Sequence, residues 1–267
     1  MSRFPAEWLT SREPHDLAAR NRIVLEAVRK AFRDRSAISI LDLACGTGST
    51  LRALSTGLPP RQEWHLVDHD TGHLAEAAAL ACPPHRTVTT KNIDLVRQLD
   101  SAFEDSIHFV TTSALLDLVS SEWLDRLITA LSGRQLPFYA ALTYDGRAVA
   151  EPADPLDPEL LVCFNAHQRS DKGFGPALGP AAAYVVAQRL GDRGYECLQG
   201  RSDWVFGTNS HAMQEAVFLG WATAAEGKLS VAEVQAWLAR RRAHLVQRRS
   251  TLRVGHVDCF ACPMGMR

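Results

Sequence analysis

The chain has 267 residues, of which 46% are hydrophobic and 22% are charged, and its formal net charge is -1 at pH 7. This size and hydrophobic content suit one α/β domain with elaborations, whereas the near-zero charge excludes the class of strongly basic nucleic-acid-binding proteins. No run of eighteen apolar residues occurs, so a membrane-spanning helix is not expected.

The cysteine usage and the N-terminal segment favour a cytoplasmic location. The first sixteen residues lack the apolar core of a secretion signal. The six cysteines are scattered through expected core segments, which is typical of free thiols in a reducing compartment.

Residues 5–33 read as a helical leader. Apolar residues recur there near helical spacing: Leu17, Ile23, Val24, Ala27, Val28 and Phe32. Two interpretations are open. The leader either packs on the sheet as a surface helix, or it forms a lid over a ligand, with Arg20 or Arg12 reaching a carboxylate.

The stretch from Ile38 to Thr50, ISILDLACGTGST, is the first recognisable unit. An apolar strand runs into a turn with Gly46 and Gly48, and a helical pattern follows. Glycines allow backbone to approach a ligand closely and to take positive φ. A strand, a glycine turn and a helix start predict a nucleotide-binding unit.

Strands and amphipathic helices alternate over residues 38–144. After the first strand, further strands are predicted at 64–68, 86–88, 107–113 and 136–144, with helices at 50–56, 73–81 and 121–131. Asp70 and Ser120 are predicted N-caps. This alternation predicts a doubly wound, mostly parallel sheet.

The sequence changes character at Asp145. A proline- and acid-rich connection and an apolar segment precede a polar run at 165–180, which we expect to be a loop. A helix is predicted at 181–189, a strand within 195–206, two helices in 210–249 and the last strand at 250–261. The second of those helices should start at a capping box formed by Ser230 and Glu233. The predicted fold is therefore α/β, with a seven-stranded sheet, an N-terminal helical lid and a helical insertion before the last strand.

The glycine loop departs from a dinucleotide-binding motif. Gly46 and Gly48 are present, but Leu51 takes the place of the third glycine, and Asp42 lies inside the strand. Asp68 ends the second strand about twenty residues later, where an acid can accept hydrogen bonds from both hydroxyls of a ribose. No lysine followed by Ser or Thr comes after the loop, which excludes a P-loop.

The ordered series LDLACGTGS, LVDHD, NIDL and FVTTSALLDLV resembles the motifs of class I S-adenosylmethionine-dependent methyltransferases. The resemblance covers residues 38–145 well and 181–261 in outline. It implies S-adenosylmethionine as cofactor and S-adenosylhomocysteine as product. It also implies one methyltransferase domain over 1–267, with a leader at 1–34, a cofactor-binding core at 38–145 and a substrate-side region at 146–267.

The resemblance assigns cofactor contacts residue by residue. The loop would run beside the amino-acid end of the cofactor, with Asp42 either anchoring the loop or contacting that end, and Asp68 would hold the ribose. Asp94 would accept from the adenine amine, although Asn92 competes for that role. The implied cofactor-binding set is Asp42, Ala44, Gly46, Gly48, Asp68, His69, Asp94, Leu95, Ser113, Ala114 and Arg20. Simple loop capping is the alternative role for Asp42 and Asp68.

Acceptor groups should come from loops beyond the carboxyl ends of the strands. His167, which can take a proton at neutral pH, and Tyr144 are the candidate catalytic residues. The candidate substrate-binding residues are Asp117, Asp145, Asn165, Gln168 and Lys172. A solvated loop with incidental polar residues is the alternative for the 165–180 segment.

Two further motifs carry less weight. Cys259 and Cys262 have CxxC spacing, but no second pair accompanies them, so no metal site is expected. Five arginines cluster at the end of the 210–249 segment and form either a solvated face or a patch for RNA or an acidic partner: Arg240, Arg241, Arg242, Arg248 and Arg249.

The leading functional hypothesis is methyl transfer to the O or N of a small-molecule acceptor. The fourth strand ends in TTSALLDL and lacks the [DN]PP[FYW] motif of nucleic-acid amine methyltransferases, which argues against DNA and, less strongly, against RNA. The alternatives are an RNA or protein methyltransferase that docks through the arginine-rich helix, and a non-catalytic S-adenosylmethionine-binding protein. No membrane partner is expected, and the oligomeric state is left open between monomer and homodimer.

Overall fold

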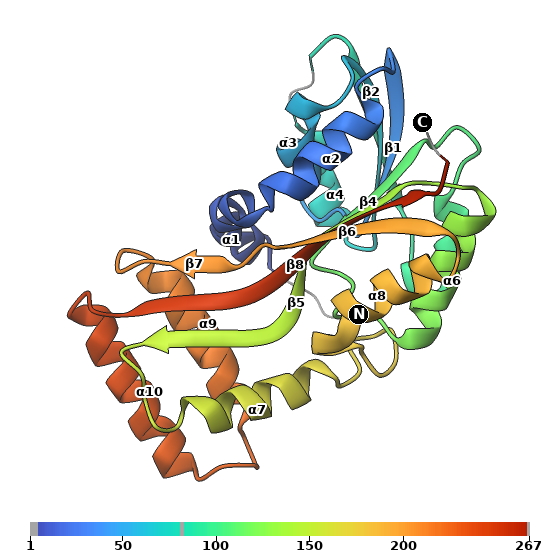
Figure 1. Cartoon of the computed structure of the whole chain (residues 1–267). Helices are drawn as coiled ribbons and strands as arrows, with labels where there is room; N and C mark the ends of the chain where they lie inside the picture. The colour runs from blue at the N-terminus through green and yellow to red at the C-terminus, as the bar shows by residue number, and fades with distance from the viewer. Residues whose placement is uncertain (1–4, 81–82, 266–267) are drawn as a thin grey trace.

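A central mixed sheet organises the chain, whose computed structural model describes residues 5–80 and 83–265 (Figure 1). The strands are β1 Ala37–Leu43, β2 Arg61–Asp68, β3 Arg86–Asn92, β4 Phe109–Ser113, β5 Phe138–Glu151, β6 Tyr195–Arg201, β7 Trp204–Phe206 and β8 Thr251–Pro263. Their order across the sheet is β3-β2-β1-β4-β5-β8-β6, with β7 also paired to β8. The first five strands pair in parallel, and β8 runs antiparallel to β5, β6 and β7. The predicted doubly wound, mostly parallel α/β fold is confirmed.

The strands β6 and β7 occupy one position at the edge of the sheet. Tyr195 pairs with Pro263 and Phe206 pairs with Leu252, so the register along β8 is the same before and after the break. At the break, the Ser202 N–H still donates to the His256 carbonyl at 2.9 Å. The eight strands therefore fill seven positions across the sheet, and the strand predicted within 195–206 is confirmed.

Ten helices belong to the described part of the chain. They are α1 Ala6–Ala19, α2 Arg22–Phe32, α3 Ser49–Leu54, α4 Thr71–Ala78, α5 Leu95–Gln98, α6 Ser121–Gly133, α7 Asp157–Gln168, α8 Ala182–Gly191, α9 His211–Ala224 and α10 Val231–Val246. Asp70 caps α4 by accepting from the Gly72 and His73 N–H groups, and Ser120 caps α6 by accepting from the Trp123 N–H, as predicted. No described helix is long and apolar enough to cross a bilayer.

Alternate residues of β1 point to opposite faces of the sheet, because side chains alternate along a strand. Leu41 and Leu43 join a buried cluster with α6 and α8, whereas Ile38 and Ile40 join a second cluster with α2, α3 and α4. Helices thus cover both faces of the parallel part of the sheet, as Figure 1 shows.

The outer halves of β5 and β8 carry a third buried cluster that the sequence did not reveal. These halves extend past the parallel strands and are covered by α7, α9 and α10, with β7 beside them (Figure 1). Trp221 and Trp237 stack there with ring centroids 6.2 Å apart. This cluster builds a wall beyond the carboxyl ends of the parallel strands.

Three local predictions were wrong. Strand β5 continues to Glu151, although a connection was predicted from Asp145, because β8 supplies a long partner strand. The helix α7 extends to Gln168, so the start of the expected 165–180 loop is helical; Leu160 and Cys163 bury one face of that helix. Ser230 precedes α10 but makes no capping hydrogen bond, so the capping box does not form.

Two bulges shape β5 where it passes the carboxyl ends of β1 and β4. The β5–β8 register shifts between Ala140 and Thr143 and again between Tyr144 and Ala148. Leu142 takes φ of 54° and Gly146 takes φ of 87°. Bulges bend a strand and re-aim its side chains, and they occur often next to active sites.

Candidate active site

A cavity of about 110 Å³ lies beyond the carboxyl ends of β1, β2 and β4. It is lined from α1, from the loops after these strands and from the segment before α8. The lining residues are Leu9, Arg12, Asp16, Ala44, Cys45, Gly46, Thr47, Ser49, Thr50, Asp68, His69, His73, Ser113, Ala114, Leu115, Leu118, Lys172 and Phe174. We call it the first cavity. The carboxyl ends of parallel strands are where open α/β sheets bind ligands.

The glycine loop forms the floor of the first cavity. Gly46 has φ of +53°, and a Cβ added to it would lie 3.3 Å from Leu9 Cδ1. Gly48 has φ of +84°, and a Cβ there would lie 2.9 Å from Leu80 Cδ1. Both positions therefore require glycine for conformation, and Gly48 requires it for space as well.

Asp68 braces this loop from the end of β2. Its Oδ2 accepts from the Gly46 N–H at 2.9 Å, and its Oδ1 accepts from the Asp70 N–H at 3.0 Å. His69 Nδ1 lies 3.1 Å from Oδ1. Asp68 is buried and lines the first cavity, so its carboxylate both holds the loop and faces the space where a ligand would lie.

Asp42 lies beneath the loop and does not line the cavity. Its side chain is fully buried, and its Oδ1 accepts from the Thr111 hydroxyl at 2.8 Å across the β1–β4 pair. Its Oδ2 has no hydrogen-bond partner among the described residues. Burial raises the pKa of this carboxyl to about 7, although Thr111 and Arg20 oppose the shift.

Ala44 and Ala114 follow the ends of β1 and β4, and both take positive φ, 53° and 51°. Side chains rarely adopt this conformation. Both alanines line the first cavity together with Ser113. Strained backbone of this kind is found often at ligand sites.

Five residues of the predicted cofactor set do not line the first cavity: Asp42, Gly48, Asp94, Leu95 and Arg20. Asp94 caps α5 by accepting from the Val96 N–H at 3.0 Å, and Leu95 is buried in the core. Arg20 is buried beside Tyr139, to whose hydroxyl its Nη1 donates at 3.3 Å. Arg12, named as the alternative to Arg20, does line the cavity, and α1 covers it as the predicted lid would.

A second cavity of about 370 Å³ adjoins the first and lies against the outer halves of β5 and β8. Its lining residues are Trp8, Arg12, Ala114, Asp117, Leu118, Leu142, Tyr144, Phe164, His167, Gln168, Lys172, Trp204, Ala216, Val217, Gly220, Trp221, Val254 and His256. Arg12, Ala114, Leu118 and Lys172 line both cavities. The two spaces therefore meet at the end of β4.

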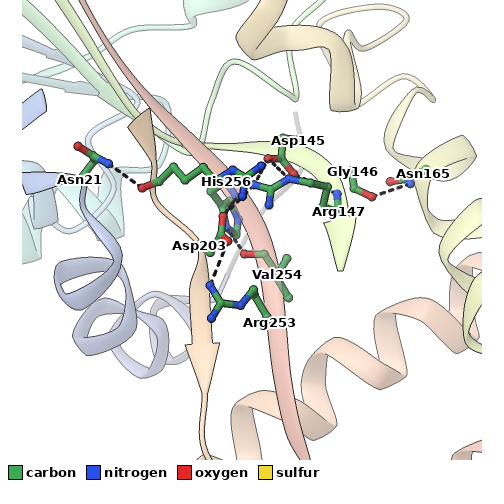
Figure 2. Close-up of polar contacts among 10 residues, drawn as sticks. Asn21, Asp145, Gly146, Arg147, Asn165, Asp203, Arg253, Val254 and His256 are labelled. Atoms are coloured by element: carbon green, nitrogen blue, oxygen red, sulfur yellow. Dashed lines mark hydrogen bonds and ion pairs between the residues drawn. The ribbon is translucent and has the colours of Figure 1, made fainter. Parts of the chain in front are cut away.

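Five of the seven predicted acceptor residues line the second cavity: Asp117, Tyr144, His167, Gln168 and Lys172. The other two point elsewhere. Asp145 pairs with Arg147, which also contacts Asp203 at 2.9 Å (Figure 2). The Asn165 amide accepts from the Tyr144 hydroxyl at 2.8 Å and donates to the Gly146 carbonyl at 2.9 Å.

Burial shifts the pKa of several ionisable groups that line the second cavity. Burial raises the pKa of Asp117 to about 6 and lowers that of His256 to about 3, so His256 is neutral at pH 7. Burial also raises the pKa of Tyr144 above its usual range. Burial first, and then the Lys172 cation, lower the pKa of His167, which lies at the exposed rim 3.3 Å from Lys172 Nζ.

Sequence reasoning missed the residues that form most of the wall. Trp8, Trp204, Trp221 and His256 come from α1, β7, α9 and β8, and no local pattern connects them. His256 is fixed by its backbone N–H, 3.3 Å from Asp203 Oδ1, and by Nδ1, which lies 3.1 Å from the Val254 carbonyl oxygen (Figure 2). The available signal was that aromatic residues are more frequent in the second half of the chain than in the first.

Three arginines of the arginine-rich run form ion pairs within the fold, and the CxxC pair belongs to no metal-binding group of the described residues. Arg241 is fully buried and pairs with Asp157, while Arg240 and Arg242 form ion pairs with Asp154 and Glu215. Across residues 5–80 and 83–265, no group of three or more His, Cys, Asp or Glu side chains is placed to hold a metal ion.

Comparisons with known proteins agree with this geometry. Residues 40–133 match the model of a family described as "Methyltransferase domain". None of the curated proteins compared with this chain matches it.

Among solved structures, a suspected methyltransferase of Bacillus halodurans C-125 has a TM-score of 0.50 at 13% identity, over 90% of this chain and 99% of that chain. The YcgJ protein of Bacillus subtilis has a TM-score of 0.49 at 12% identity, over 92% and 100% of the two chains. A Thiobacillus denitrificans methyltransferase in complex with S-adenosyl-L-homocysteine has a TM-score of 0.44 at 14% identity, over 98% and 100%. At these identities the likeness to the Bacillus halodurans structure concerns the fold alone. Residues 40–133 thus match a methyltransferase domain, and the chain has the fold of the class I S-adenosylmethionine-dependent methyltransferases.

Proposed function

We propose that this protein binds S-adenosylmethionine in the first cavity and methylates the O or N of a small molecule in the second cavity. The observation that carries the proposal is the junction of the two cavities at Arg12, Ala114, Leu118 and Lys172. A methyl donor and an acceptor must meet in line within a few ångströms, since positioning supplies much of the rate enhancement. Adjoining cavities with a shared wall provide such a meeting point.

The residues of the first cavity fit this cofactor. Gly46 lines the cavity without a side chain, and Asp68 presents a buried carboxylate to the same space. A carboxylate suits a pair of ribose hydroxyls, because charge-assisted hydrogen bonds are strong. When bound, S-adenosylmethionine supplies an electrophilic methyl group on a sulfonium.

We assign the remaining roles by position. Ala44 and Gly46 border the amino-acid end of the cofactor with Ser113 and Ala114, while Gly48 shapes the loop where it packs against Leu80. His69 lies beside Asp68. Arg12 replaces Arg20 as the cation nearest to that end, because Arg12 lines the first cavity and Arg20 does not. His167, Gln168 and Lys172 form the entrance side of the acceptor cavity.

The test measures product formation with separated classes of acceptor. Purified protein is incubated with S-adenosylmethionine and with the small-molecule, RNA or protein fraction of a cell extract, and S-adenosylhomocysteine is quantified by mass spectrometry. We expect release with the small-molecule fraction alone. Release with RNA or protein instead would overturn the acceptor class, and cofactor binding without release in any fraction would indicate a non-catalytic protein.

A matched control separates cofactor binding from background hydrolysis. In Gly48→Val, the new Cβ meets Leu80 and the backbone is strained at φ of +84°. We expect this variant to lose both S-adenosylmethionine binding, measured by calorimetry, and product release.

A further inference from the structure

Aromatic side chains make up much of the wall of the second cavity. Trp8, Tyr144, Phe164, Trp204 and Trp221 line it from five different elements. They meet mostly edge to face: the Tyr144 and Phe164 centroids are 5.6 Å apart at 78°, and those of Trp8 and Trp204 are 6.5 Å apart at 75°. Walls of this kind favour flat aromatic ligands, which gain stacking or edge-to-face contacts beyond their buried area.

Two cations make this cavity unsuitable for a positively charged ligand. The Arg12 guanidinium lies 5.1 Å from the centroid of the Trp204 ring, and Lys172 also lines the cavity. Aromatic cages bind ammonium ligands through the faces of their rings, but here a protein cation already lies over the Trp204 ring. A cationic acceptor would also be repelled by Lys172, and an anionic acceptor would be repelled by the Asp117 carboxylate, so a neutral acceptor is favoured.

Among the described residues that line the second cavity, Asp117 is the one carboxylate. Its side chain is only 6% exposed, and its Oδ1 has no hydrogen-bond partner among the described residues. A buried acceptor atom without a donor costs about 1–3 kcal/mol, and rotation of the carboxylate toward the cavity would let a ligand hydrogen recover it. Asp117 also stands between Ala114 and Leu118, which line both cavities, so it lies close to their junction.

We infer that the acceptor is a neutral, planar aromatic compound whose O–H or N–H donates a hydrogen bond to the Asp117 carboxylate. This inference rests on the proposed function and names its substrate class. As the acceptor atom gains the methyl group, its proton passes to Asp117 and then to water, and that proton carries away the positive charge that the donor loses. With a pKa of about 6, Asp117 is largely ionised at neutral pH and can accept this proton.

The experiment uses three ligands of similar size: 2-naphthol, 2-methoxynaphthalene without the donor hydrogen, and decahydro-2-naphthol without the flat ring. Calorimetry measures their dissociation constants with the wild-type protein, alone and saturated with S-adenosylhomocysteine. We expect 2-naphthol to bind at least tenfold more tightly than either analogue. Equal affinity for 2-methoxynaphthalene would overturn the role of the donor hydrogen, and equal affinity for decahydro-2-naphthol would overturn the aromatic class.

Three variants locate the binding. Asp117→Asn should weaken 2-naphthol binding at least fivefold and leave 2-methoxynaphthalene unchanged, while Asp105→Asn, at an exposed loop position, should behave as wild type. Gly220→Leu should abolish binding of 2-naphthol, because Gly220 lines the cavity and a Cβ there lies 3.9 Å from Phe164 Cε2, so a longer side chain would occupy the space. Leucine also stabilises the helix relative to glycine, which guards against loss of folding.

Binding of S-adenosylhomocysteine is titrated separately with every variant and should stay unchanged. Failure of that titration with wild type would count against the proposed function, whereas the naphthol series without cofactor still decides the acceptor class. If Asp117→Asn and Gly220→Leu both bind 2-naphthol as wild type does, the inference is wrong.

Discussion

The Tyr144 hydroxyl donates a hydrogen bond to Asn165 Oδ1 at 2.8 Å and thereby ties β5 to the last turns of α7. The same amide donates to the Gly146 carbonyl at 2.9 Å, in the second bulge of β5. The phenol hydrogen of Tyr144 is therefore used in a structural hydrogen bond, although the ring forms part of the cavity wall.

Replacement of Tyr144 by phenylalanine should affect stability more than chemistry. We expect Tyr144→Phe to lower the free energy of unfolding by about 1 kcal/mol, because Asn165 loses a donor. The pH profile of turnover should not change, since burial holds the pKa of the phenol above its usual range. Urea unfolding and rate measurements check both points, with Tyr184→Phe, 71% exposed, as control. A hundredfold loss of turnover in a stably folded Tyr144→Phe would restore Tyr144 as a proton donor.

Removal of the Asp68 carboxylate should weaken S-adenosylmethionine binding at least tenfold. The variant Asp68→Ala loses the expected ribose contacts and also the acceptors for the Gly46 and Asp70 N–H groups. Calorimetry measures the dissociation constant, and Asp105→Ala serves as an exposed control. An unchanged affinity in Asp68→Ala would refute the assignment.

His167 should affect turnover rather than cofactor binding. It lines the second cavity and is absent from the first, and burial and the Lys172 cation lower its pKa, which keeps it neutral at pH 7. We expect His167→Ala to bind S-adenosylmethionine as wild type does and to turn over the true acceptor more slowly. Full activity of His167→Ala would assign it to the solvated rim instead.

The buried Asp42 carboxyl should make the protein less stable as pH rises from about 4 to about 7. Its pKa is raised to about 7 in the folded chain, against about 4 when unfolded. Between these values the folded chain binds more protons than the unfolded chain, so stability falls with rising pH by up to about 1.4 kcal/mol per pH unit. In Asp42→Asn this contribution is absent.

The effect of Asp42 is measured as the difference in the free energy of unfolding between Asp42→Asn and wild type. This difference is needed because His256 changes the stability of both proteins with pH in the opposite direction. The pKa of His256 is lowered to about 3 by burial, so its contribution is lost as pH falls below about 6.5. Urea unfolding at several pH values should show Asp42→Asn gaining stability relative to wild type as pH rises. A constant difference across the range would contradict the raised pKa.

The sequence predicted the first cavity far better than the second. Gly46, Gly48 and Asp68 belong to one strand-loop-helix unit and the next strand, so local pattern and spacing suffice to bring them together. Asp94, by contrast, caps a helix in this structure. Aspartate is as common at a helix N-cap as it would be suitable for binding adenine, so the residue type alone could not distinguish the two roles.

The walls of the second cavity depend on tertiary pairing. Residues 145–151 looked like the start of a proline- and acid-rich connection, yet they pair with β8 as a strand, and Arg147 forms ion pairs with Asp145 and Asp203. The helical position of His167 followed from burial of Leu160 and Cys163 against elements far along the chain. The spacing of apolar residues within residues 145–168 does not reveal these partners, because they lie far along the chain.

The last prediction concerns Leu142, whose backbone is held in a left-handed conformation at the first bulge of β5. Its φ is 54°, its side chain is fully buried and lines the second cavity, and its N–H donates to Asp258 Oδ1 at 2.9 Å. A left-handed conformation costs a non-glycine residue roughly 1–2 kcal/mol, and Asp258 is the contact that holds it. Glycine at this position would remove that cost.

Two substitutions separate strain from packing. Leu142→Ala should lose about 2–5 kcal/mol of stability through the lost side chain while keeping the strained backbone. Leu142→Gly loses one more carbon but relieves φ, so we expect it to be at least as stable as Leu142→Ala, whereas glycine in a regular strand is less stable than alanine by about 0.5–1 kcal/mol. Parallel urea unfolding with Ala140→Gly, in the regular part of β5, gives the reference. If glycine is worse than alanine by the same margin at both positions, Leu142 stores no strain, and the bulge follows from pairing alone.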